Sequence, residues 1–143
     1  MRTIKEVKTL YPDRVKEIEA VIRQFGDREY WMESAEDIAN HGADAGWNGF
    51  IYYTETAPFA RRHRKMILSR LIEDCEEMGE SSPAEMVQSF KCVGKDFSFH
   101  EINQVLYTGR CDDFDAESGN GEDMILNALA WYLLEDVARL FVD

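Results

Sequence analysis

The 143-residue sequence lacks the features that identify most disulfide-rich proteins, membrane proteins and nucleotide-dependent enzymes. Its three cysteines are widely spaced and include no Cys-x-x-Cys pair, which argues against a disulfide framework or a zinc knuckle. No apolar run approaches the roughly 20 residues of a membrane span, and the first residues lack the apolar segment of a secretory signal. The motifs G-x-S-x-G, G-x-G-x-x-G and the P-loop are also missing. We therefore expect a cytoplasmic protein without a cofactor and without nucleophilic catalysis.

Basic residues are scarce in one half of the chain. Residues 1–72 carry 12 Lys/Arg and 11 Asp/Glu, a net charge of +1, whereas residues 73–143 carry 4 and 17, a net charge of −13. A field of this sign repels nucleic acid and anionic lipid and attracts basic surfaces. The charge predicts no direct nucleic-acid binding, no membrane binding and a basic protein as partner. General solubility is the alternative explanation.

Apolar residues recur at intervals of three and four, between helix-capping residues and glycine stops. This pattern predicts an all-α fold, a single domain over residues 1–143 with about six helices. The best strand candidate lies in one short β-hairpin near residues 46–54, and a helix is expected over 27–41. A long helix should run from Thr56 to Gly79, and capping boxes at Ser82 and Ser98 should begin two short helices, the second of which ends near Gly109. The apolar stripe of the long helix is expected to consist of Phe59, Ile67, Leu68, Leu71, Ile72, Cys75 and Met78. The last helix, about 123–142, has an apolar stripe too wide for a surface helix.

Two acidic runs are the main candidates for partner binding. The first lies near the end of the predicted long helix, where acids oppose the helix dipole and where like charges four residues apart repel. The second lies in a loop that departs from the EF-hand pattern, with Ser118 and Met124 where glycine and glutamate are needed, so no metal is predicted. The candidate residues are Glu73, Asp74, Glu76, Glu77, Glu80, Asp112, Asp113, Asp115, Glu117, Glu122 and Asp123.

Five consecutive residues, 61–65, place four cationic side chains and His63 near the start of the same long helix. Basic residues are as unfavourable there as acidic residues are at the other end. They can bind an anion, pair with acids elsewhere in the chain, or pair with acids of a second copy. The last option makes a self-associating structural protein, with a homodimer as its simplest form.

A second candidate ligand site consists of Glu33, Asp37, His41, Asp44 and Trp47. The first three lie at i, i+4 and i+8, on one face of the predicted helix, and two carboxylates with an imidazole can bind a divalent metal or perform acid–base chemistry. A polar stripe facing solvent explains the same spacing. The alternative function is accordingly a small metal-dependent enzyme or a ligand-binding protein.

The stretches WMESAEDIANHGADAGWNGFIYYTET and LNALAWYLLEDVARLFVD resemble small acidic proteins encoded by phages and other mobile elements. This resemblance supplies no catalytic residue. It implies an anti-defence role, as in anti-CRISPR and anti-restriction proteins, which often occupy a nucleic-acid groove of a host protein. We therefore expect a non-enzymatic inhibitor that binds a basic, nucleic-acid-binding host protein or ribonucleoprotein complex through its acidic surface. Nucleic-acid mimicry is one way in which such a surface can bind.

Overall fold

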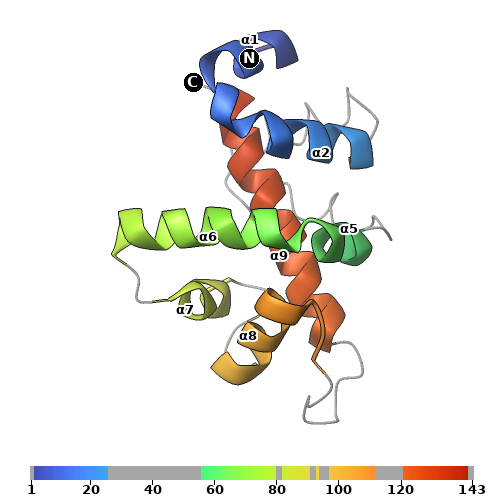
Figure 1. The fold of residues 1–143 in the computed structure, drawn as a ribbon, viewed down its shortest axis with the longest axis vertical. Helices are drawn as coiled ribbons and strands as arrows, with labels where there is room; N and C mark the ends of the chain where they lie inside the picture. The colour runs from blue at the N-terminus through green and yellow to red at the C-terminus, as the bar shows by residue number, and fades with distance from the viewer. Residues whose placement is uncertain are drawn as a thin grey trace. The chain divides into compact units, whose positions relative to one another are not determined.

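All regular structure in the described part of the chain is helical (Figure 1). The computed structural model describes residues 2–25, 56–79, 82–90, 93, 97–111 and 121–141, and none of them lies in a strand. The elements are α1 (Ile4–Leu10), η1 (Pro12–Arg14), α2 (Val15–Phe25), α5 (Thr56–Arg62), α6 (Arg64–Met78), α7 (Pro83–Gln88), α8 (Phe99–Thr108), α9 (Gly121–Ala138) and η3 (Arg139–Phe141). The all-α prediction is confirmed. The predicted helix over 27–41 and the hairpin near 46–54 lie outside the described residues.

The chain divides into two compact units. One contains residues 1–54 and 131–143, and the other contains residues 55–130. Residues 121–130 of α9 therefore belong to the second unit and residues 131–138 to the first. The single domain over residues 1–143 stays a prediction.

In the first unit, the two ends of the chain are joined by hydrogen bonds. The backbone N–H of Arg2 donates to the carbonyl of Phe141 at 2.8 Å, and its guanidinium donates to the carbonyl of Leu140 at 3.0 Å. Helix α1 then begins at Thr3, whose hydroxyl accepts a bond from the backbone N–H of Glu6 at 3.2 Å. A cap of this kind satisfies one of the free N–H groups of a first helical turn. The N-terminal segment is thus held against η3.

In the second unit, the long helix predicted from Thr56 to Gly79 is interrupted at His63. The backbone there has φ −102° and ψ 17°, outside the α-helical region. Hydrogen bonds continue through the turn, because the N–H of His63 donates to the carbonyl of Phe59 and its carbonyl accepts from Ile67, both at 3.0 Å. The prediction of one continuous helix is wrong at this residue. Neither proline nor glycine stands at the turn, so the sequence has no indication of it.

The predicted ends of α6 and α8 and the predicted starts of α7 and α8 are confirmed. Helix α6 ends at Gly79 with φ 72° and α8 ends at Gly109 with φ 79°, in the left-handed region that glycine adopts without strain. At the start of α8, Ser98 and Glu101 form a capping box with bonds of 2.9 and 3.2 Å, and the Ser82 hydroxyl accepts from the N–H of Glu85 at the start of α7. Helices α6, α7 and α8 contact one another and form the body of the unit (Figure 1).

Helix α9 is buried around most of its circumference. Its buried residues include Ile125, Leu126, Ala128, Leu129, Ala130, Trp131, Tyr132, Leu133, Leu134, Val137 and Ala138. Burying a large aliphatic side chain contributes about 1.5–3 kcal/mol. The prediction that the last helix is too apolar for a surface position is confirmed. It begins at Gly121, two residues earlier than predicted, and its last turn gives way to η3.

Helix α6 buries only a narrow stripe. Ile67, Leu71 and Cys75 are buried at intervals of four residues, which places them on one face. The sequence pattern also assigned Ile72 and Met78 to this stripe, but they are 39% and 66% exposed. That assignment is wrong because these two residues lie away from the buried row. The exposed surface of α6 therefore combines charged residues with two apolar residues, Ile72 and Met78.

Candidate functional site

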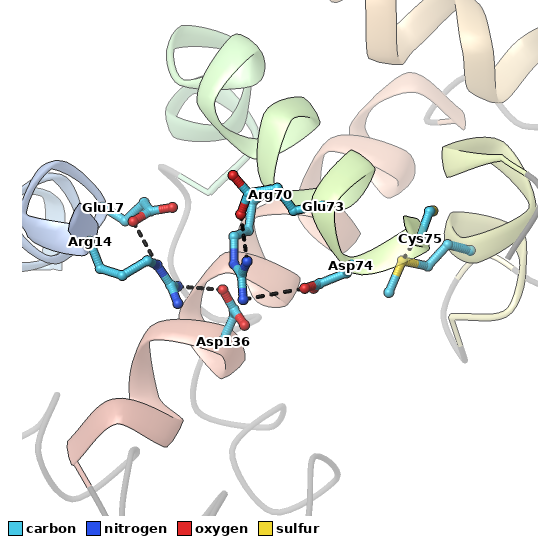
Figure 2. A network of polar contacts seen from close by, with 8 residues as sticks. Arg14, Glu17, Arg70, Glu73, Asp74, Cys75 and Asp136 are labelled. Carbon is cyan, nitrogen blue, oxygen red and sulfur yellow. Dashed lines mark hydrogen bonds and ion pairs between the residues drawn. The ribbon is translucent and has the colours of Figure 1, made fainter. Parts of the chain in front are cut away.

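The acidic end of α6 consists of Glu73, Asp74, Glu76 and Glu77, all four predicted as partner-binding residues. Glu73, Glu76 and Glu77 are exposed, whereas Asp74 is half-buried. The Arg70 guanidinium contacts two of these carboxylates, Glu73 at 2.8 Å and Asp74 at 3.2 Å (Figure 2). The Asp74 side chain is 13% exposed and the Glu73 side chain 64%. Asp74 is thus held within the unit, while most of the Glu73 side chain faces solvent.

Glu76 and Glu77 form no ion pair with another residue of the described part of the chain. They lie in the last turn of α6, where the carbonyl groups at the helix end already carry partial negative charge. Exposed carboxylates at this position are unfavourable for the isolated helix. Folding of this unit therefore does not account for them.

The second acidic run has one member with a clear structural role. The Glu122 carboxylate pairs with the Arg61 guanidinium and accepts a hydrogen bond from the N–H of Cys111 at 3.2 Å. This glutamate joins the start of α9 to α5 and to the residues after α8. Asp123 beside it is exposed. The remaining candidates lie outside the described residues: Glu80, Asp112, Asp113, Asp115 and Glu117.

The basic segment 61–65 forms the turn between α5 and α6. Arg61 pairs with Glu122 and also donates from Nε to the carbonyl of Gly109 at 3.2 Å. The expected pairing with acids elsewhere in the chain is therefore confirmed for Arg61. The His63 ring lies 4.7 Å from the Phe59 ring, centroid to centroid. Lys65, at the other end of the segment, is exposed.

A charge network in the first unit was not predicted from the sequence. Arg14 contacts Glu17 at 2.7 Å and also pairs with Asp136, a residue of α9 (Figure 2). All three side chains are between 10% and 15% exposed. The i,i+3 spacing of Arg14 and Glu17 is visible in the sequence, but nothing there identifies a partner 122 residues away. The network ties η1 and α2 to the end of α9, which is a structural role.

The pKa of the Glu135 carboxyl is shifted in the folded protein. Burial raises the pKa of its carboxyl above the usual 4.5, the Arg139 guanidinium opposes this change, and the negative charge of Asp136 adds to it. Arg139 also pairs with Glu135 directly. The carboxyl lies on α9 with its charge balanced by one exposed arginine, and it has no nucleophile or imidazole among its interacting residues.

The second candidate ligand site, which consists of Glu33, Asp37, His41, Asp44 and Trp47, lies outside the described residues. Within the described ranges, no group of three or more histidine, cysteine or acidic residues is placed to hold a metal ion. No helix of the described residues is long and apolar enough to cross a membrane. The described surface thus offers exposed charge, on α6 above all, for binding.

No curated protein and no solved structure matches the chain. A family model does match, over residues 13–143, which covers α2 and every later element. Its description is a domain of unknown function, DUF7222, and the chain belongs to this family.

Proposed function

We propose that this DUF7222 protein is a non-enzymatic interaction protein that binds a basic partner through its acidic surface. The observation that supports the proposal is the acidic end of α6. Glu76 and Glu77 are exposed in the last helical turn, where they oppose the helix dipole. Residues that reduce the stability of an isolated element are commonly retained for function.

The distribution of paired acids supports the same proposal. Asp74, Glu122 and Asp136 contact arginines of their own unit through largely buried side chains, so these acids serve the fold. Glu73 also contacts Arg70, but its side chain is 64% exposed, and an exposed ion pair of this kind adds little to stability. Glu76 and Glu77 have no such role among the described residues, and they belong to the half of the chain with a net charge of −13. A field of this strength accelerates association with a positively charged surface and selects against anionic ones.

The proposed partner is a basic, nucleic-acid-binding protein or ribonucleoprotein complex of a host cell. Duplex DNA presents one negative charge about every 1.7 Å along its axis, and a protein that binds it offers a matching row of lysines and arginines. Carboxylates spaced along a helix face can bind these lysines and arginines in place of the DNA phosphates. The resemblance to phage and mobile-element proteins adds the biological setting, which is inhibition of a defence nuclease or surveillance complex.

The test compares two variants with the same change in net charge. The variant E73Q/E76Q/E77Q neutralises three exposed acids of α6, and E6Q/D13N/E19Q neutralises three exposed acids of the first unit. Each is titrated against protamine bound to a fluorescent DNA duplex, and the displaced DNA is measured by anisotropy. The α6 variant should need about tenfold more protein to displace the duplex, since each exposed ion pair contributes about 0.5 kcal/mol.

Equal loss in both variants would contradict a localised site, because net charge alone would then explain displacement. The same three proteins, immobilised, are next used to capture proteins from a bacterial lysate. A basic nucleic-acid-binding protein retained by wild type and by the first-unit variant, but lost from the α6 variant, is the expected result.

A further inference from the structure

The outer face of α6 carries a continuous stripe with a charge gradient. Its members lie four, three and four residues apart within α6 and are all exposed: Lys65, Ser69, Ile72 and Glu76. This spacing keeps side chains on one side of a helix and is the spacing by which two long helices pack together. The first part of the stripe is basic, its centre is small or apolar, and its last part is acidic. We call it the α6 stripe.

The charge gradient is unfavourable within a single copy. Lys65 lies in the first turn of α6, where the helix dipole is positive, and Glu76 lies near the last turn, where it is negative. The two residues are eleven positions apart, about 16 Å along the axis, so they do not pair within one helix. A partner with the reverse gradient would compensate both ends at once.

We propose that the occupant of the α6 stripe is a second copy of the same helix, docked antiparallel about a two-fold axis. When Ser69 lies opposite Ile72 of the second copy, symmetry places Ile72 opposite the other Ser69. Lys65 lies four residues before Ser69, and Glu76 lies four residues after Ile72. The same register therefore brings Lys65 of each copy opposite Glu76 of the other.

Self-complementarity selects a second copy over an unrelated partner. An isologous interface requires a surface that matches itself under two-fold rotation. The α6 stripe meets this condition because Lys65 matches Glu76 in charge and the small Ser69 leaves room for Ile72. A parallel arrangement would instead place Lys65 against Lys65 and Glu76 against Glu76. Antiparallel packing also sets the two helix dipoles in opposite directions. With one exposed isoleucine per copy at its centre, the interface depends mainly on charge.

This inference goes beyond the proposed function and is tested with the protein alone. The mass in solution is measured by light scattering at low and at high salt. Wild type should be a dimer at low salt and dissociate as salt rises, because screening shortens the range of exposed charge interactions. A monomer at low salt, at the highest attainable concentration, would overturn the proposal.

Single charge reversals make the test specific. K65E and E76K should each raise the dimer Kd by about tenfold or more, because each places like charges opposite one another at two symmetric positions. Both changes favour the helix dipole, so the variants should keep the helical circular dichroism of wild type. K5E, on exposed Lys5 of α1, has the same charge change as K65E and should leave the dimer intact.

Two rescue experiments complete the design. The double variant K65E/E76K reverses the gradient and should restore the homodimer. A mixture of K65E and E76K should form a heterodimer, because an all-acidic stripe then faces an all-basic one. Failure of both rescues would reject the antiparallel register. Binding to protamine is measured separately, so either proposal can fail without the other.

Discussion

Helices α6 and α9 use charge in opposite ways. Helix α9 places Glu122 and Asp123 in its first turn, where the dipole favours acids, and Glu122 also pairs with Arg61. Helix α6 places basic residues first and acidic residues last. Most of α9 is buried, whereas the outer face of α6 is exposed. Folding therefore accounts for the charges of α9 but not for those on the outer face of α6, which is the surface that we propose for interaction.

The largest effect should come from the buried surface of α9. Leu129 is fully buried, and Leu129→Ala should lower the free energy of unfolding by about 3 kcal/mol, because it removes apolar contacts and leaves a cavity. Met124 on the same helix is 40% exposed, and Met124→Ala should change it by less than about 0.5 kcal/mol. Urea unfolding measures both. Similar losses in the two variants would remove the distinction between the buried and exposed faces.

The network around Arg14 should have the next largest effect. Arg14→Met removes the guanidinium that Glu17 and Asp136 share and should cost about 2 kcal/mol, since these carboxylates are largely buried. Lys5→Met on the exposed side of α1 is the matched loss of a cation and should be nearly neutral. Thermal unfolding of both variants tests whether buried and exposed charges differ as proposed. A neutral Arg14→Met would show that the network adds nothing to stability.

A smaller effect is expected at the start of α9. Glu122→Gln and Asp123→Asn each remove one negative charge from the same helical turn, so their effects through the helix dipole are similar. Glu122→Gln should cost about 1 kcal/mol more, because it also removes the ion pair with Arg61. The difference between the two unfolding free energies is the measured quantity. Equal unfolding free energies in the two variants would show that the ion pair of Glu122 adds nothing to stability.

Glu135 provides a test by pH. Because burial raises the pKa of its carboxyl in the folded state, the folded state binds the proton more tightly than the unfolded chain does. Ionised Glu135 therefore disfavours folding once the pH exceeds the pKa values of both states. Relative to wild type, Glu135→Gln should gain stability as the pH rises from below 4.5 to neutrality. Thermal unfolding across this pH range measures the difference. If the guanidinium of Arg139 lowered the pKa of Glu135 by more than burial raises it, Glu135→Gln would instead lose stability relative to wild type as the pH rises.

Much of the helical pattern could be predicted because it depends on local chemistry. Ser98 with Glu101 and the glycines at 79 and 109 determine helix ends through bonds within a few residues, and the structure confirms them. The apolar composition of α9 likewise predicted its burial. The turn at His63 was missed, because residues 59–67 contain no proline or glycine that would indicate one.

The candidate site could be predicted only in part, for a physical reason. Sequence shows which residues are acidic, but pairing depends on residues far along the chain. Asp74 has a local partner in Arg70, whereas Glu122 pairs with Arg61 and Asp136 with Arg14 across long stretches of sequence. The exposure of Ile72 was not predicted, because this residue is apolar and directly follows the buried Leu71 in the sequence. These distinctions separate structural acids from those available for binding.

The most direct test is the free energy of unfolding of E73Q/E76Q/E77Q against wild type, at neutral pH and at low protein concentration. If the exposed acids of α6 serve interaction and not folding, their neutralisation should leave stability unchanged or raise it by up to about 0.5 kcal/mol, because charges that oppose the helix dipole are removed. A loss of about 1 kcal/mol or more, well above what exposed charges normally contribute, would show that these acids hold the fold together and would contradict the account.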